Sequence, residues 1–182
     1  MSIHKNQEGF SYIDVLIAIT LLSIGLLALV AAVTASVVQT RAGEQNLLAK
    51  QYGASTLESI FSARDIGVLG WEAVGNVGAN PDPNTGVMQG KFSVGRKPIY
   101  PDDGPDNIMG TDDDTGTPVK GFDRQIVITD ICDPDRPSAN CNPSGSYAVM
   151  MRKVEVTIYY QVTGGWRSEK TTTIISNSLV DQ

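Results

Sequence analysis

The chain has 182 residues, with 14 Lys and Arg against 20 Asp and Glu, which gives a net charge of −6. This length suffices for one modest domain beside a membrane-length helix, and the acidic balance leaves no basic face for a phosphate backbone, so we expect no nucleic-acid partner. The single histidine, His4, lies near the N-terminus, which argues against Ser-His-Asp, Cys-His and His-ligated zinc chemistry and predicts that the chain is not an enzyme.

A long apolar run follows a short polar leader at the N-terminus. The leader covers residues 1–9, and residues 10–36 are long enough for a transmembrane helix, which needs roughly 20 apolar residues. Asp14 is the one charged residue in this run, and an ionisable group at such a depth normally marks a functional partner. A secretory signal peptide cut near residues 32–35 and a plain signal anchor are two interpretations, but neither has a use for Asp14.

The residues around Gly9 and Phe10 support a third interpretation. Residues 9–18, GFSYIDVLIA, resemble the processing motif of type IV pilins and type II secretion pseudopilins, and residues 22–29 are similar to minor pilins of the PilV type. The resemblance implies cleavage by a prepilin peptidase after Gly9 and N-methylation of Phe10. It also implies that the new α-amine of Phe10 pairs with the Asp14 carboxylate of an adjacent subunit, where the family usually has Glu.

This resemblance implies a structural role. The chain would be a minor type IV pilin that primes or caps pilus assembly, with a type II secretion pseudopilin as the alternative. Its partners would be other pilin or pseudopilin subunits, the prepilin peptidase and the inner membrane, with the C-terminal domain in the periplasm until the subunit enters a filament. Head-to-tail contacts of this kind propagate into helical filaments. From another class, a membrane-anchored calcium-binding adhesin-like domain that never assembles is a further alternative.

Residues 37–66 continue the apolar run as an amphipathic helix. No proline occurs before Pro81, so we expect one continuous helix, with Gly43 and Gly53 as flexible points. The apolar residues near helical spacing, which we expect to face the domain, are Leu47, Leu48, Tyr52, Leu57, Ile60 and Phe61.

An acidic loop at residues 101–117 lies within a Gly-, Pro- and Asp-rich stretch. Calcium prefers six to eight oxygen ligands, and this loop places aspartates between turn residues, although it does not fit the EF-hand spacing. The loop resembles the calcium loop of major pseudopilins, which implies Asp106, Asp113 and Asp114 as ligands, with Asp103 and Asp112 as further candidates. A solvated acidic loop without a metal is the alternative.

The rest of the globular region, residues 67–182, carries the β signal. Alternating and β-branched residues predict strands at 124–131, 147–162 and 167–176, with a tight turn at 162–166 and a short strand at 91–94. The expected fold is α+β and type IV pilin-like: a long N-terminal helix packed on one face of an antiparallel sheet. Cys132 and Cys141 flank a polar loop and predict a disulfide outside the cytosol, with two free thiols as the alternative.

Overall fold

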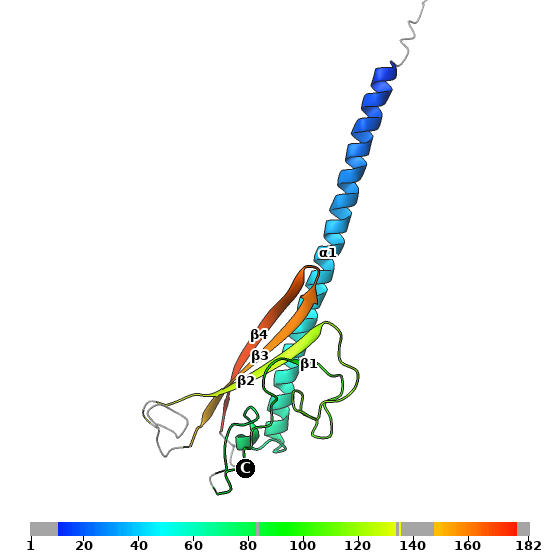
Figure 1. Cartoon of the computed structure of the whole chain (residues 1–182). Coiled ribbons are helices and arrows are strands. Elements are labelled where there is room, and N and C mark those ends of the chain that lie inside the picture. Colours follow the sequence, from blue (N-terminus) through cyan, green and yellow to red (C-terminus); the bar gives the residue numbers. More distant parts are fainter. Residues whose placement is uncertain (1–10, 83, 134, 136–147, 178–182) are drawn as a thin grey trace, which may run out of the picture. The chain divides into compact units, whose positions relative to one another are not determined.

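The computed structural model describes residues 11–82, 84–133, 135 and 148–177, and it has an α+β architecture (Figure 1). Its elements are the helix α1 (Tyr12–Asp65), the 3₁₀-helix η1 (Trp71–Ala73), and the strands β1 (Lys97–Pro98), β2 (Phe122–Asp130), β3 (Met151–Val162) and β4 (Gly165–Ser176). The chain divides into two compact units, residues 1–43 and residues 44–182. The expected α+β fold with one N-terminal helix and an antiparallel sheet is confirmed.

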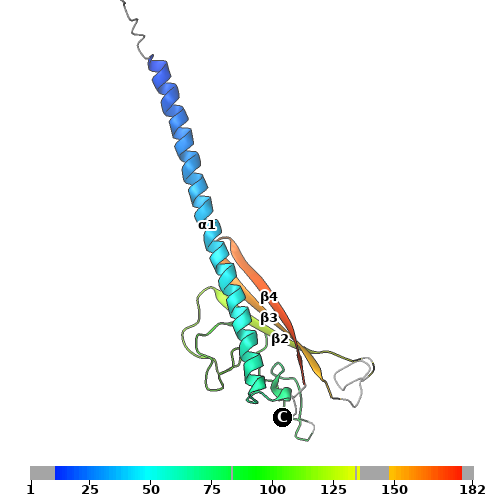
Figure 2. The same ribbon diagram turned by 180° about the vertical axis from the view of Figure 1, so that it is seen from behind.

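The helix is unbroken from Tyr12 to Asp65, as the absence of proline predicts. Within the second unit, its last turns pack on the sheet through a face of mostly small residues, and Figure 2 shows these turns in front of the strands. Gly53 belongs to this face, because a Cβ there would lie 3.1 Å from Thr171 Oγ1. Its role in the fold is therefore close packing. The buried residues of α1 are Ala49, Gly53, Thr56, Leu57, Ile60 and Ala63.

Two of the residues expected on this buried face lie outside it. Leu47 and Leu48 are 58% and 38% exposed, whereas Ala49 is completely buried. A helix that approaches a sheet closely favours small residues at the contact, so the larger leucines are turned away from it. The expectation that Leu47 and Leu48 face the domain is therefore wrong, whereas it is confirmed for Leu57 and Ile60.

The sheet has the strand order β1-β2-β3-β4, and all three pairings are antiparallel. Strand β3 alternates in burial, with Val154, Val156 and Ile158 fully buried on the face toward α1. Each such side chain stabilises the fold by about 1.5–3 kcal/mol relative to an exposed one. Strands β3 and β4 form a hairpin in which Val162 pairs with Gly165, so the turn lies where the sequence predicts it.

The start of β3 and the short strand at residues 91–94 differ from the predictions. Residues 148–150 precede β3 without regular structure, and residues 91–94 form no named strand; Phe92 makes one isolated bridge to Asn76. The fully buried Phe92 side chain explains the apolar signal there, because it fixes this segment to the core without a strand partner. The short strand of this region is β1, which pairs with the start of β2 through Lys97 and Arg124.

Candidate functional site

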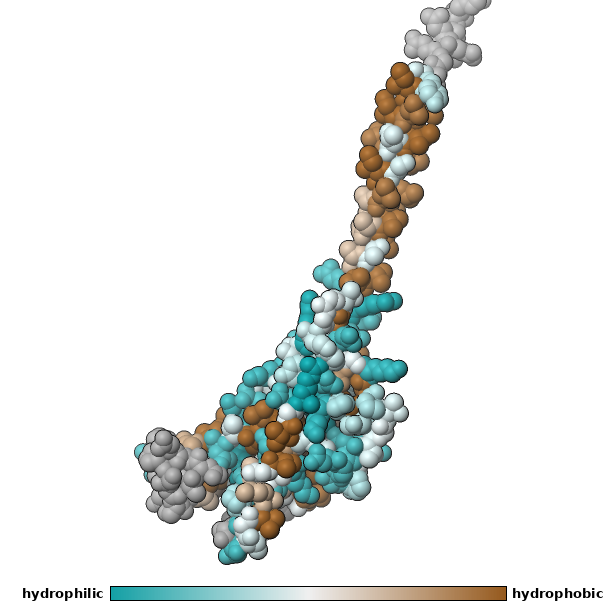
Figure 3. Space-filling view, viewed as in Figure 1, coloured by the Kyte–Doolittle hydropathy of each residue, from teal (hydrophilic) through white to brown (hydrophobic). Residues whose placement is uncertain are grey.

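The first unit presents an apolar helix surface that its own residues leave uncovered. Every residue from Ser11 to Arg41 is exposed, and Leu22 and Leu27 are 73% and 71% exposed. Figure 3 shows this part of α1 as an almost continuous hydrophobic surface. By length and composition the helix is able to cross a membrane. Its surface is compatible with lipid or with other apolar helices.

Asp14 lies in the first turn of this helix and helps to begin it. Its Oδ2 accepts a hydrogen bond from the backbone N–H of Ser11 at 3.2 Å, which is one half of a capping box. The backbone N–H of Asp14 donates in turn to the Ser11 carbonyl at 2.9 Å. A carboxylate at this end also interacts favourably with the helix dipole. Asp14 is therefore both an exposed negative charge and a helix-capping residue.

Three hydroxyl groups of the apolar segment donate hydrogen bonds within the helix. Thr20 donates to the Ile17 carbonyl, Ser23 to that of Ile19 and Thr34 to that of Val30, each at 2.8 Å. Such bonds back to the preceding turn allow Ser and Thr to lie in an apolar environment without an unsatisfied donor. These three side chains therefore do not prevent burial of the segment in lipid or among helices.

Several of the predicted site residues lie outside the described part of the chain. Gly9 and Phe10, the proposed cleavage junction, belong to this group, and so does Cys141. Cys132 follows β2 and is not a free cysteine. Cleavage after Gly9, the pairing of Phe10 with Asp14 and the pairing of Cys132 with Cys141 all stay predictions.

The acidic loop is organised by hydrogen bonds to its own backbone and hydroxyl groups. Asp106 Oδ1 accepts from the N–H of Ile108 at 2.9 Å, and Asp113 Oδ1 accepts from the Thr111 hydroxyl at 2.5 Å. The Thr111 bond lowers the pKa of Asp113 below its ordinary value, more strongly than partial burial raises it. Ile108 is 1% exposed and anchors the loop in the core. The aspartates therefore shape the loop as well as charge it.

Asp114 is held differently from the other aspartates. Its Oδ2 lies 2.5 Å from Arg124 Nη2, and the two side chains are only 5% and 6% exposed. Burial raises the pKa of Asp114, whereas the Gly110 N–H and the Arg124 guanidinium lower it. Burial also lowers the pKa of Arg124, against the charge of Asp114. The pair is a buried ion pair that links the loop to β2.

The described carboxylates do not form an assembled metal site. Among the residues that the structure describes, no group of three or more His, Cys, Asp or Glu side chains is placed to hold a metal ion. Of the candidate ligands, Asp112 accepts from the Ser93 hydroxyl and Asp114 is paired with Arg124. Calcium binding by Asp103, Asp106, Asp112, Asp113 and Asp114 stays a prediction, and it requires some of these carboxylates to change partners.

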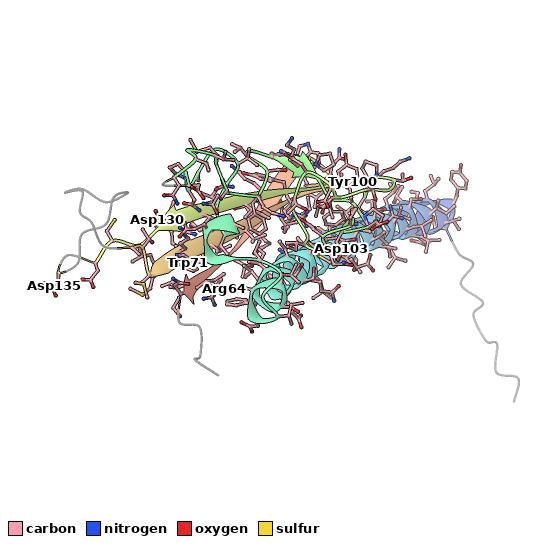
Figure 4. The ribbon with its side chains drawn as sticks, turned by 90° about the horizontal axis from the view of Figure 1, so that it is seen from below. Arg64, Trp71, Tyr100, Asp103, Asp130 and Asp135 are labelled. Atoms are coloured by element: carbon pink, nitrogen blue, oxygen red, sulfur yellow. The ribbon has the colours of Figure 1, made fainter. Side chains whose placement is uncertain are left out.

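The sequence did not predict the buried arginines. Arg152 is 1% exposed and bonds to Asp130, to Glu72 and to the carbonyl oxygens of Trp71 and Val74. Its guanidinium lies 4.4 Å from the Trp71 ring centre. The guanidinium of Arg64 lies 5.3 Å from the same ring, and Figure 4 labels Arg64 and Trp71. Arg152 and Arg124 occupy inward positions of their strands, where the alternation predicts apolar residues. That break in the pattern was the signal available in the sequence.

Comparison with protein-family models, characterised proteins and solved structures finds no match to this chain. A function for this chain is therefore inferred from its residues and their geometry.

Proposed function

We propose that this chain is a minor subunit of a type IV pilus, with a structural role in priming or capping the filament and no catalysis. The observation that carries the proposal is the exposed apolar segment of α1 with Asp14 in its first turn. In the proposal, a prepilin peptidase cleaves between Gly9 and Phe10, and the subunit stays in the inner membrane with residues 44–182 in the periplasm until it is incorporated.

The energetics of the helix surface support this role. Burying one Leu, Ile or Val side chain stabilises a protein by about 1.5–3 kcal/mol relative to leaving it in water. More than ten such side chains are exposed on this segment. Lipid covers such a surface before assembly, and neighbouring helices cover it in a filament. A charge at that depth is costly unless it meets a partner, and the α-amine that cleavage creates on Phe10 of an adjacent subunit supplies one.

A pseudopilin of a type II secretion system is the second candidate. The acidic loop at residues 101–117, with its resemblance to pseudopilin calcium loops, favours it. Both functions share the prepilin peptidase cleavage and the contact between subunits in the filament. They differ only in the system, pilus or type II secretion, to which the filament belongs. Copurification of the detergent-solubilised protein with the secretin complex of one system or of the other would separate them.

Intact-mass spectrometry of the protein extracted from membranes tests the processing step. The expected mass begins at Phe10 and carries one additional methyl group. A retained Met1 or a start near Ser36 would contradict the proposal. A retained Met1 would favour a simple anchor, such as that of an adhesin-like domain, and a start near Ser36 would favour a cleaved signal peptide.

Substitution of Asp14 tests the assembly step, and two variants separate its two roles. Asp14→Ala removes both the charge and the acceptor for the Ser11 N–H, whereas Asp14→Asn removes the charge and keeps an acceptor. We expect both variants to insert and lose the leader, and both to be absent from sheared filaments. Asp14→Asn in filaments at the normal amount would show that capping, and not charge pairing, is what Asp14 supplies.

A further inference from the structure

A groove of about 750 Å³ runs along the last turns of α1 within the second unit. One wall is formed by residues of α1 that include Glu58 and by Ile66, which follows the helix, and the other by the loop from Asp103 to Met109. The Met109 N–H donates to Ser59 Oγ at 3.1 Å, which ties the loop to the helix. Figure 4 shows Asp103 beside α1. The groove therefore lies between a helix and a loop that are hydrogen-bonded to each other.

Part of the groove is apolar and open to solvent. Ile66 and Val68 are 71% and 58% exposed, and Met109 adds a partly buried thioether side chain. Exposed apolar residues that are concentrated in a concave site, with polar residues at the rim, mark binding surfaces more often than scattered ones do. An occupant with an apolar side chain would gain by covering Ile66 and Val68.

The polar part of the groove is negatively charged. Glu58, Asp103 and Asp106 line it, and no Lys, Arg or His is among its described lining residues. Within the described chain, none of these three carboxylates takes part in an ion pair. Among the residues that the structure describes, the three carboxylates form no assembled metal site. These carboxylates favour an occupant with positive charge on a side chain, and an anionic lipid or nucleic acid is disfavoured.

We propose that this groove binds a segment of another protein chain that presents a Lys or Arg side chain beside an apolar side chain. The cation meets Glu58, Asp103 and Asp106, and the apolar side chain covers Ile66 and Val68. Complementary charge of this kind orients and selects a partner, while the apolar contact supplies burial. The inference stands on the groove alone and does not depend on the filament proposal.

Photo-crosslinking of the full-length protein in its host membrane tests the proposal. A benzophenone amino acid replaces Val68 in the groove or, as a control, Val87, which is 63% exposed and does not line the groove. We expect an adduct from position 68 whose partner peptide, located by mass spectrometry, contains Lys or Arg next to an apolar residue. No protein adduct at position 68, or one to a segment without a basic residue, would overturn the proposal.

Neutralising the groove tests the charge requirement. The variant Glu58→Gln/Asp103→Asn/Asp106→Asn should lower the adduct yield roughly tenfold, because the cation of the partner then meets no carboxylate in the groove. The matched control Glu44→Gln/Asp65→Asn/Asp135→Asn changes three exposed acids outside the groove and should leave the yield within about twofold. Equal yields in the two variants would contradict the proposal.

Salt provides a second measurement on the unaltered groove. Raising the ionic strength of isolated membranes before irradiation should weaken the adduct from position 68, because exposed charges are screened. An adduct that is insensitive to salt would also contradict the proposal, even where the triple variant fails to fold. The mass of the mature N-terminus tests the filament proposal separately, so the two can fail independently.

Discussion

Arg124→Met is a substitution from which the structure predicts a large local effect. Arg124 and Asp114 form an ion pair at 2.5 Å with both side chains almost fully buried. Arg124 Nη1 also donates to Thr56 Oγ1 at 3.3 Å, so the guanidinium connects β2, α1 and the acidic loop. Removing it leaves the Asp114 carboxylate buried, with the Gly110 N–H as its remaining described donor.

The expected cost follows from that stranded carboxylate. Breaking a buried pair by removing one partner destabilises a protein by about 3–5 kcal/mol, because the other charge stays buried without compensation. For a domain of this size that corresponds to a fall in melting temperature of about 10 °C or more. Replacing both partners by apolar residues, in Asp114→Leu/Arg124→Met, removes the buried charge and should recover most of the loss.

The pH dependence of the single variant has a defined sign. Burial already raises the pKa of Asp114 in the folded protein, and loss of Arg124 removes one of the interactions that lower it. A carboxyl whose folded pKa lies above its unfolded value binds more protons in the folded state across that interval. The stability of Arg124→Met relative to the unaltered protein should therefore be best in acid, and should fall as the pH rises from the ordinary carboxyl pKa through the raised one.

Pulse proteolysis in urea, on the full-length protein in detergent micelles, measures these differences in stability without relying on tryptophan fluorescence. Arg96→Met is the matched control, because Arg96 pairs with Asp123 at 2.6 Å while its side chain is 36% exposed. Exposed pairs contribute about 0–1 kcal/mol. The reasoning is refuted by an Arg124→Met variant no less stable than Arg96→Met, or by a double variant no more stable than Arg124→Met.

Three further predictions concern the acidic loop. Gly104→Ala should destabilise the domain more than Gly86→Ala, because both glycines have φ near +70° but only at Gly104 would a Cβ meet a backbone atom, Asp113 O at 2.3 Å; urea titration compares them. Adding EDTA should lower the melting temperature of the full-length protein in micelles and CaCl₂ should restore it, and indifference to both leaves a solvated loop without calcium. Thr111→Val should return the lowered pKa of Asp113 toward its ordinary value, as ¹³C NMR of the carboxyl group would show. Because the fold lowers this pKa, the Asp113 carboxylate stabilises the protein at pH values above its ordinary pKa. This stabilisation is lost as the pH falls through the lowered pKa, and Thr111→Val should not show that loss.

The elements with a strong periodic signal were predictable from the sequence. The helix runs without a break because no proline interrupts it before Pro81, and β3 follows the alternation of Val154, Val156 and Ile158. The hairpin turn is fixed by consecutive glycines, Gly164 and Gly165, which both adopt positive φ. In each case the determinant is local, so a single sequence contains it.

The parts that were not predictable depend on contacts between distant segments. Arg124 and Arg152 are buried because Asp114, Glu72 and Asp130 reach them from elsewhere in the chain. Apolar spacing alone placed Leu47 toward the domain, whereas the close approach of the helix to the sheet selects Ala49 and Gly53 instead. Pairing and approach distance are properties of the folded chain, and periodicity does not encode them.

Asp14 shows how the two kinds of information combine. Its position in an apolar run indicates a charge with a partner, and the structure adds a bond from the Ser11 N–H to Oδ2 at 3.2 Å. These roles are compatible, because a carboxylate has about four acceptor positions and one cap bond leaves the others for a cation. Glu at the same position of a capping box reaches back to the same N–H. Asp14→Glu should therefore keep both roles while Asp14→Asn keeps only the cap, so assembly by the first variant and not by the second would assign filament entry to the charge.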